Sequence, residues 1–254
     1  MLVDLRRSLA GTDPGRLGAE GDRRSHALIT GLLASARPDD PVLSEEGVDN
    51  GRRLASQRVW IVDPLDGTRE YGEGDRVDWA VHVALWSDGD LVAGAVALPA
   101  VAHLSGLLRD GPPHERVDRA RFTWATARDH GGAEDAAPPP TGRLVVSRTR
   151  PPSFAAEVGR ESGLEVVPLG SAGAKIMAVV RGEADAYVHA GGQFEWDSAA
   201  PVAVARWHGL HTSRIDGSPL TYNRPDPSLP DIVVCRPELA EPLLAAVAQA
   251  MRGS

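Results

Sequence analysis

The 254-residue chain has a single cysteine, Cys235, and a single lysine, Lys175, among its 27 basic residues. One cysteine excludes an internal disulfide and any zinc or iron–sulfur site built from several cysteines. Free thiols are typical of reducing compartments, so we expect a cytoplasmic protein. Because every other basic residue is arginine, Lys175 is a compositional exception that calls for an explanation.

The chain also lacks long apolar runs and net positive charge. The most apolar stretch, residues 91–108, is interrupted by Gly94 and Pro99, and an alternating stretch precedes it, so we expect a β-hairpin rather than a transmembrane helix. Residues 1–7 carry charges where a signal peptide needs an apolar stretch. The formal net charge of -8 disfavours binding to nucleic acid polymers or to an anionic membrane.

Three common catalytic motifs are missing as well. The sequence has no GxxxxGK phosphate loop, no GxGxxG dinucleotide motif and no GxSxG nucleophile elbow. Apolar residues make up 42% and charged residues 24% of the chain, as in ordinary globular proteins. We therefore expect a folded protein of another enzymatic or binding class.

The apolar patterns predict a sheet-rich first part. A helix is expected over residues 20–36, strands over 42–43 and 58–62, a hairpin of 79–86 and 91–98, and strand-like pieces near Leu104 and Phe122. Residues 129–140 are rich in glycine, proline and acids, which is typical of a solvated connector. We place a subdomain boundary there, between residues 1–139 and 140–254.

The second part alternates short strands with helices. Strands are expected over 144–146, 164–168 and 184–188, and helices over 151–161, 171–181, 199–207 and 239–247. Such alternation favours a parallel or mixed sheet covered by helices.

Carboxylates are concentrated where strands end or helices begin. The run Asp63-Pro64-Leu65-Asp66-Gly67-Thr68 is the richest segment, and the others are Asp22, Ser44-Glu45-Glu46-Gly47 and Asp197. Proline fixes one backbone angle and glycine permits a tight turn, so Asp63 and Asp66 can converge at the end of the 58–62 strand. Carboxylate oxygens are the ligands that Mg²⁺ prefers.

The same run offers a place for an anion. Backbone N–H groups of Gly67 and Thr68, at a turn that enters a helix, can bind phosphate, and the Thr68 hydroxyl can orient a water molecule. Asp197 precedes an apolar helix, whose N-terminus favours negative charge. Taken singly, each segment also fits an ordinary turn, a solvated corner or a helix cap; only their combination points to a metal-dependent site.

Together, Ser44-Glu45-Glu46-Gly47, the segment from Trp60 to Thr68 and Trp196-Asp197-Ser198-Ala199-Ala200 resemble the signatures of the inositol monophosphatase superfamily of Mg²⁺-dependent, lithium-sensitive phosphatases. The resemblance extends from about Asp22 to Asp197. It implies an α/β fold of the layered α/β/α/β/α sandwich type found in sugar phosphatases. It also implies that residues 1–139 bind metal and that residues 140–254 contribute Asp197 and substrate recognition.

The resemblance assigns roles by position. Glu45, Asp63 and the carbonyl of Leu65 would hold one Mg²⁺, and Asp63, Asp66 and Asp197 a second, with a third ion possible at Glu45. Thr68, together with Asp22 or Glu45, would orient the attacking water. The amides of Gly67 and Thr68 would hold the phosphate.

The segment Asp63 to Tyr71 looks most like that of the 3′(2′),5′-bisphosphate nucleotidase branch, the CysQ type. Segments similar to that branch's nucleotide-binding segments add Ser147, Arg148, Ser171, Lys175 and His189 as candidate substrate-binding residues. His189 stands where this branch often has arginine. We expect Lys175 to meet the second phosphate or the adenine, the alternative being an exposed lysine of no special role.

The expected function is therefore hydrolysis of the 3′-phosphate of 3′-phosphoadenosine 5′-phosphate (PAP), or of its sulfated analogue, in sulfur assimilation. The alternatives are an inositol or fructose 1,6-bisphosphate phosphatase with the same metals, and a catalytically silent binding protein. The expected partners are a small phosphate substrate, with no nucleic acid polymer and no membrane, and a second copy of the chain in a homodimer.

Overall fold

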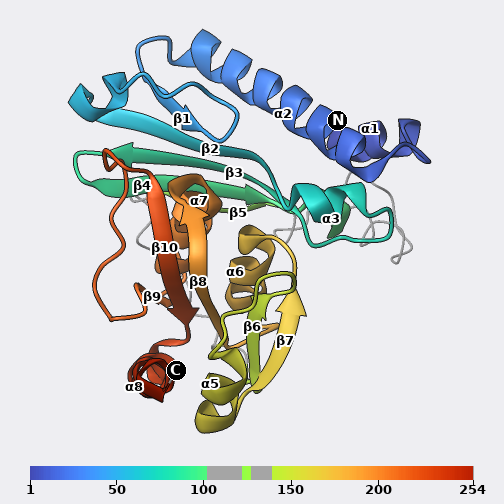
Figure 1. The fold of residues 1–254 in the computed structure, drawn as a ribbon. Coiled ribbons are helices and arrows are strands. Elements are labelled where there is room, and N and C mark those ends of the chain that lie inside the picture. Colours follow the sequence, from blue (N-terminus) through green and yellow to red (C-terminus); the bar gives the residue numbers. More distant parts are fainter. Residues whose placement is uncertain (102–121, 127–138, 254) are drawn as a thin grey trace.

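The computed structural model describes residues 1–101, 122–126 and 139–253, which form two sheets separated and flanked by helices (Figure 1). Leu104 and most of the expected connector lie outside the described residues. The strands of the first sheet fall within residues 42–126 and those of the second within 143–235. The subdomain boundary at 139/140 stays a prediction.

The first sheet has five strands in sequence order. They are β1 (Val42–Ser44), β2 (Arg58–Asp66), β3 (Ala80–Ser87), β4 (Asp90–Ala97) and β5 (Phe122–Thr126). β1 is parallel to β2, and the other pairs are antiparallel, so β3 and β4 form the expected hairpin. β2 runs on to Asp66 instead of ending at Val62, because an irregularity in its pairing with β3 accommodates the residues between Asp63 and Asp66.

α2 (Pro14–Ala36) lies along one face of this sheet, and α1 (Leu2–Ser8) and α3 (Thr68–Gly72) pack against α2 (Figure 1). α2 begins earlier than expected because Asp13 caps it, accepting the N–H of Arg16 at 3.0 Å, and Pro14 occupies the first turn. A Cβ added to Gly18 would lie 2.6 Å from Cγ2 of Thr68. This close approach brings the side of α2 that carries Asp22 against Thr68.

The second sheet is mixed, as expected. Its strands are β6 (Arg143–Ser147), β7 (Glu165–Leu169), β8 (Ala186–Phe194), β9 (His211–Ser213) and β10 (Ser228–Cys235), in the order β7-β6-β8-β10-β9. β6 is parallel to β7 and β8, whereas β10 is antiparallel to β8 and β9. β9 and β10 were not expected, because β9 is short and the sequence between them shows no alternating pattern.

The remaining helices define the layers. α6 (Ala172–Val180) and α7 (Glu195–Trp207) lie between the sheets, while α5 (Ala155–Ser162) and α8 (Ala240–Gly253), which follows the short turn η3 (Pro237–Leu239), cover the outer face (Figure 1). Alternate residues of the second sheet point into hydrophobic cores on its two faces. Val145 and Tyr187 pack with α6 and α7, and Val146 and Val188 pack with α5 and α8. The order helix, sheet, helix, sheet, helix confirms the expected layered sandwich. Among the described residues, no helix is both long and apolar enough to cross a bilayer.

Candidate active site

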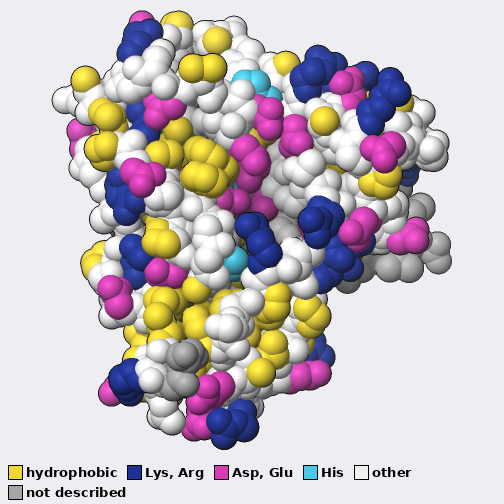
Figure 2. All heavy atoms as spheres, viewed as in Figure 1, with side chains coloured by type: hydrophobic (Ala, Val, Ile, Leu, Met, Phe, Trp, Pro, Cys, Tyr) yellow, Lys and Arg dark blue, Asp and Glu magenta, His cyan; other side chains and the backbone are white. Residues whose placement is uncertain are grey.

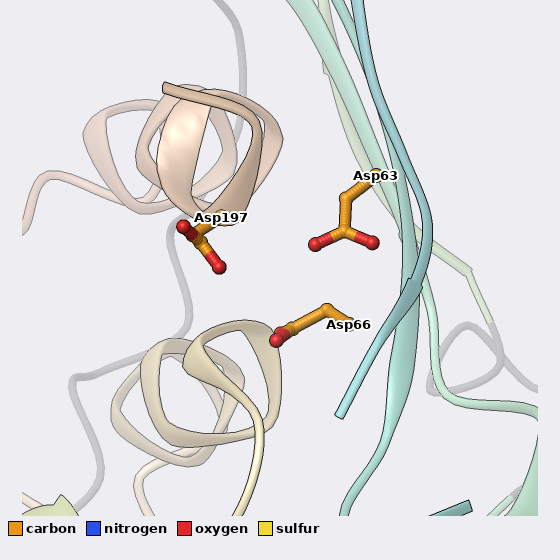
Figure 3. Close-up of side chains that lie close together, drawn as sticks. All are labelled: Asp63, Asp66 and Asp197. Atoms are coloured by element: carbon orange, nitrogen blue, oxygen red, sulfur yellow. The ribbon is translucent and has the colours of Figure 1, made fainter. Parts of the chain in front are cut away.

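Three aspartates meet where β2 ends beside the N-terminus of α7. Asp63 and Asp66 come from β2 and Asp197 from the first turn of α7, and one carboxylate oxygen of each lies within 4.8 Å of the others (Figure 3). Asp63 and Asp66 are only 1% and 6% exposed. The structure thus brings together three of the predicted metal ligands.

Local geometry explains how β2 presents its two acids. Oδ1 of Asp63 accepts the N–H of Leu65 at 3.0 Å, which folds the chain tightly around Pro64. Gly67 then adopts a positive φ of 87°, a conformation that suits glycine, and α3 begins at Thr68. The expected turn that enters a helix is therefore present, although the bend from Asp63 to Asp66 before it lies inside β2 rather than after the strand.

Asp66 is held by the first turn of α6, which the sequence had not suggested. Its carboxylate accepts the N–H of Ala172 at 3.1 Å and that of Gly173 at 2.6 Å, and it also accepts the hydroxyl of Ser171. Nε2 of His82 lies 3.4 Å from Oδ2 of Asp66. Because α6 belongs to the layer between the sheets, this carboxylate joins the two halves of the molecule.

Asp197 is fixed differently. It lies within α7, not before the helix as expected, and its Oδ2 accepts the N–H of Phe194 at 2.6 Å. This hydrogen bond satisfies a free donor at the start of the helix, where negative charge is favoured.

Thr68 connects the site to α2. Its Oγ1 lies 3.3 Å from Oδ1 of Asp22 and 3.1 Å from the carbonyl oxygen of Leu65, so the hydroxyl hydrogen has two acceptors. Asp22 is 7% exposed and faces the site from α2. The structure therefore brings Thr68 together with Asp22 and the Leu65 carbonyl in one small cluster, while the roles that the family resemblance gives these residues stay predictions.

Crowded carboxylates raise one another's pKa values here. Burial, and next the charge of Asp66, raises the pKa of Asp197 to about 7. Burial raises the pKa of Asp63 well above its usual range, with Asp66 and Glu45 as further causes. The pKa of Glu45 is raised to about 7, first by desolvation from the surrounding protein and then by the charge of Asp22, although this residue lies on an exposed loop.

Asp22 follows the same pattern, since burial and the charge of Glu46 raise its pKa to about 7. A group of buried acids with raised pKa values is one whose negative charge is not compensated by the protein. Hard oxygen donors that converge with uncompensated charge fit a divalent cation such as Mg²⁺. Glu45 and Asp22 lie close enough for their charges to interact electrostatically with the aspartate cluster, but they stand outside the closely spaced triad.

A cavity of about 320 Å³ opens beside the triad. Its lining includes Asp66, Asp197 and most of the predicted substrate-binding residues, namely Gly67, Thr68, Ser147, Ser171, Lys175 and His189. Figure 2 shows acidic side chains gathered near the centre of one face, with Lys or Arg side chains beside them.

Lys175 lines the cavity but is buried, and its ammonium is hydrogen-bonded to the backbone. It is 4% exposed, and its Nζ donates to the carbonyl oxygens of Gly170 and Ser171 at 3.1 and 2.5 Å. Burial lowers its pKa to about 8, which leaves the ammonium largely charged at neutral pH. The alternative of an exposed lysine is wrong, whereas contact with substrate stays a prediction.

Two other predicted substrate-binding residues are buried or paired within the protein: His189 is buried, and Arg148 forms ion pairs. His189 is 2% exposed, and burial, helped by the charges of Lys175 and Arg150, lowers its pKa to about 4, so its ring is neutral at pH 7. The guanidinium of Arg148 pairs with Glu70 and Glu73 at 2.8 and 3.0 Å and does not belong to the cavity lining.

Comparison with known proteins agrees with the geometry. Residues 11–252 match the model of the inositol monophosphatase family. The chain belongs to this family. It is 46% identical over 257 residues to the 3′-phosphoadenosine 5′-phosphate phosphatase of Mycobacterium tuberculosis, an alignment that covers 99% of this chain and 90% of that protein.

Two further proteins extend the comparison. The chain is 31% identical over 202 residues to the 3′(2′),5′-bisphosphate nucleotidase CysQ of Escherichia coli, covering 79% of this chain and 77% of CysQ. The structure of an IMPase/NADP phosphatase complexed with Mg²⁺ and phosphate superposes with a TM-score of 0.69 at 19% identity, covering 89% of this chain and 80% of that one. This structural likeness confirms the fold.

Several lining residues escaped the sequence analysis. Arg150, Tyr187 and Gln193 face the same cavity as the predicted set. Arg150 follows Ser147-Arg148 by two positions, so the motif pointed to the correct loop but to the wrong arginine for lining the cavity. Tyr187 and Gln193 lie on β8 with His189, and the alternation of a strand was the available signal.

Proposed function

We propose that this protein is a Mg²⁺-dependent phosphatase that removes the 3′-phosphate of PAP, leaving AMP and inorganic phosphate. One observation carries the proposal: two aspartates of the acidic triad, Asp66 and Asp197, line one cavity together with a basic wall of two arginines. The triad suits a metal-bound phosphate, and basic groups suit a second, remaining phosphate. The names of the relatives from M. tuberculosis and E. coli support the same substrate class.

The basic wall has two arginines available for a second phosphate. Arg69 and Arg150 line the cavity, and neither forms an ion pair with the described residues. The charge of Arg150 acts on Asp197, Tyr187 and His189, so it lies near these three lining residues. A substrate with one phosphate would leave Arg150 without a phosphate to bind, so the two lining arginines favour a bisphosphate over inositol monophosphate.

The metal ligands that we propose are Asp63, Asp66, Asp197, Glu45 and the carbonyl of Leu65. Bound Mg²⁺ would neutralise the phosphate, lower the pKa of water and stabilise the leaving oxygen. Two or three ions are proposed, and the magnesium in the related phosphatase structure is consistent with this chemistry.

The chain's own groups then arrange the reaction. Thr68 Oγ1, held between Asp22 and Leu65, accepts a hydrogen bond from the attacking water. Its own hydroxyl hydrogen points towards Oδ1 of Asp22, so a proton from the water can be relayed to that carboxylate. The N–H groups of Gly67 and Thr68 hold the phosphate. Water attacks phosphorus and loses a proton by way of Thr68 towards Asp22, the bond between phosphorus and the 3′ oxygen breaks, and that oxygen takes a proton from solvent water to become the 3′-hydroxyl of AMP.

A substrate panel tests the proposal. Phosphate release from PAP, inositol 1-phosphate and fructose 1,6-bisphosphate is compared with Mg²⁺ and with EDTA. PAP is expected to be cleaved fastest, and only with Mg²⁺. Faster cleavage of either sugar phosphate would replace the proposal by the corresponding alternative, and no release with any substrate would indicate a catalytically silent protein.

A charge variant tests the second phosphate. Arg150→Gln should raise KM for PAP roughly 10- to 100-fold, the value of one charge-assisted hydrogen bond, and leave KM for p-nitrophenyl phosphate unchanged. Arg143→Gln, at an exposed position on β6, is the matched control. Equal changes for both substrates would refute a contact between Arg150 and a second phosphate. The cytoplasmic location and the homodimer stay predictions.

A further inference from the structure

A buried arginine lies between the loop that carries Glu45 and the helix that carries Asp197. Arg53 belongs to the short helix η1 (Arg52–Ala55), is 2% exposed, and is not part of the cavity or of the aspartate triad. A buried guanidinium needs partners for its N–H groups, because an unpaired buried charge is strongly destabilising. Its partners show which parts of the chain it connects.

One partner lies on the loop after β1. The Nε and NH2 atoms of Arg53 lie 3.0 and 2.9 Å from Oδ2 of Asp49, four positions after Glu45. Oδ1 of Asp49 accepts the N–H of Gly51 at 2.9 Å, which closes the turn. Arg53 therefore fixes the far end of the loop, while β1 fixes its beginning.

The other partners, Asn223 and Pro225, lie on the segment between β9 and β10. NH1 of Arg53 donates to Oδ1 of Asn223 at 2.9 Å, and Nδ2 of Asn223 donates back to the carbonyl oxygen of Arg53 at 3.4 Å. Asn223 has a positive φ of 59°, which an asparagine tolerates better than most residues. Residues 170 positions apart are thus joined by a two-way hydrogen bond.

Asn223 passes the connection on to α7. Its backbone N–H donates to Oε2 of Glu195 at 2.6 Å, and that of Arg224 donates to Oε1 of Glu195 at 2.9 Å. Glu195 is the first residue of α7, is completely buried, and precedes Asp197 by two positions. Movement of this segment therefore moves the turn that presents Asp197.

We propose that Arg53, Asn223 and Glu195 form a clamp that holds the Glu45 loop against the first turn of α7 and so sets the spacing of the metal ligands. The proposal rests on the proposed metal-dependent function. Without a cation, the carboxylate of Glu45 is repelled by Asp22 and Asp66. The clamp resists this repulsion and keeps the loop ordered before a metal ion binds. Metal binding therefore does not have to supply the free energy of ordering the loop. All three members of the clamp are positioning residues.

The experiment measures metal affinity without substrate. Mg²⁺ binding to the full chain is followed by titration calorimetry, and amide hydrogen exchange is measured over residues 45–55, for the wild type, Arg53→Met and Glu195→Gln. Arg53→Met should weaken Mg²⁺ binding about 10-fold or more, as loss of an outer partner of a metal site does, and should speed exchange in the loop. Arg53→Lys should regain part of the affinity, because it restores the charge without the planar fork.

The matched control is Arg52→Met, an exposed neighbour on η1 whose side chain makes no hydrogen bond or ion pair with the described residues. It should bind Mg²⁺ as the wild type does. A folded Arg53→Met protein with a lower Tm but wild-type Mg²⁺ affinity and loop exchange would overturn the clamp. If Arg53→Met does not fold, Glu195→Gln, which keeps the shape of the side chain, decides by the same two measurements.

The outcomes also separate this inference from the function. A wild type that binds Mg²⁺ and cleaves PAP, with variants that bind Mg²⁺ equally well, would refute the clamp alone. A wild type that binds no Mg²⁺ would refute the proposed function and the clamp together.

Discussion

The N–H of Gly173 donates to Oδ2 of Asp66 at 2.6 Å, across 107 positions of the chain. This bond ties the end of β2 in the first sheet to the first turn of α6 in the layer between the sheets. A proposed metal ligand is thus oriented by a helix N-terminus, whose partial positive charge favours the carboxylate.

Removing single charges from the triad should abolish turnover. Asp66→Asn and Asp197→Asn each replace a proposed ligand by a neutral amide of the same shape. Activity should fall by more than about 100-fold, since even outer partners of metal sites change activity by about 10- to 100-fold. Phosphate release and Mg²⁺ calorimetry measure the effect, and Asp39→Asn, on an exposed loop, is the control. Full activity in both variants would refute the metal assignment.

The hydroxyl of Thr68 should matter for the rate and not for metal binding. Thr68→Val keeps the shape of the side chain but removes the group between Asp22 and Leu65, so we expect kcat to fall by about 100-fold or more, the usual value of positioned proton transfer. Thr68→Ser keeps the hydroxyl and should retain most of the rate. Equal losses in both variants would show that packing of the methyl group, and not the hydroxyl, is what counts.

Stability without metal should fall as the pH rises. Asp22, Glu45 and Asp197 have pKa values raised to about 7 in the folded protein, whereas unfolded carboxyl groups titrate near 4. Their protonated forms therefore favour the folded state below the unfolded pKa, and this contribution disappears as the pH rises through about 7.

Thermal unfolding in EDTA measures this dependence. The Tm should be lower at about pH 8 than at about pH 5, and the rise in Tm on adding Mg²⁺ should be larger at the higher pH, because the metal displaces protons from its ligands. Asp197→Asn should flatten the profile. A Mg²⁺ effect that is the same at both pH values would contradict the prediction.

Two glycines should respond in opposite directions to alanine. A Cβ on Gly173 would lie 2.0 Å from Nε2 of His82, so Gly173→Ala should push α6 from Asp66, lower the Tm and weaken activity. Gly31 lies in α2 with no atom within 4 Å of such a Cβ, so Gly31→Ala should raise stability by up to about 1 kcal/mol. Denaturant unfolding compares the two. A neutral Gly173→Ala would mean that His82 can move away at little cost.

The parts of the site that lie in short motifs could be predicted from sequence. Asp63, Asp66, Gly67 and Thr68 lie within residues 63–68, where proline restricts the backbone and glycine permits a tight turn, which is enough to foresee their convergence. The layered fold could be expected from the family resemblance and from the alternation of strands and helices in the second half. Helix starts were less accurate, because capping by Asp13 moved the start of α2.

Side-chain partners that depend on the folded path of the chain could not be foreseen. Nothing in the sequence around Lys175 indicates that its ammonium donates to the backbone of its own helix start, because that depends on the path of residues 169–171. Arg148 was chosen for its motif, but Glu70 and Glu73 on another element compete for it. Arg53 and Asn223 carry no motif at all, and only the folded chain brings them together.

α7 follows β8 directly, with Phe194 as the last residue of the strand and Glu195 as the first of the helix. No loop separates the two, so the rotation of the helix is tied to the pairing of Phe194 with Ser228 on β10. A slip of one residue along that ladder would turn the helix by about 100° and carry the carboxylate of Asp197 out of the triad. The chemistry beside the first sheet therefore depends on strand alignment in the second.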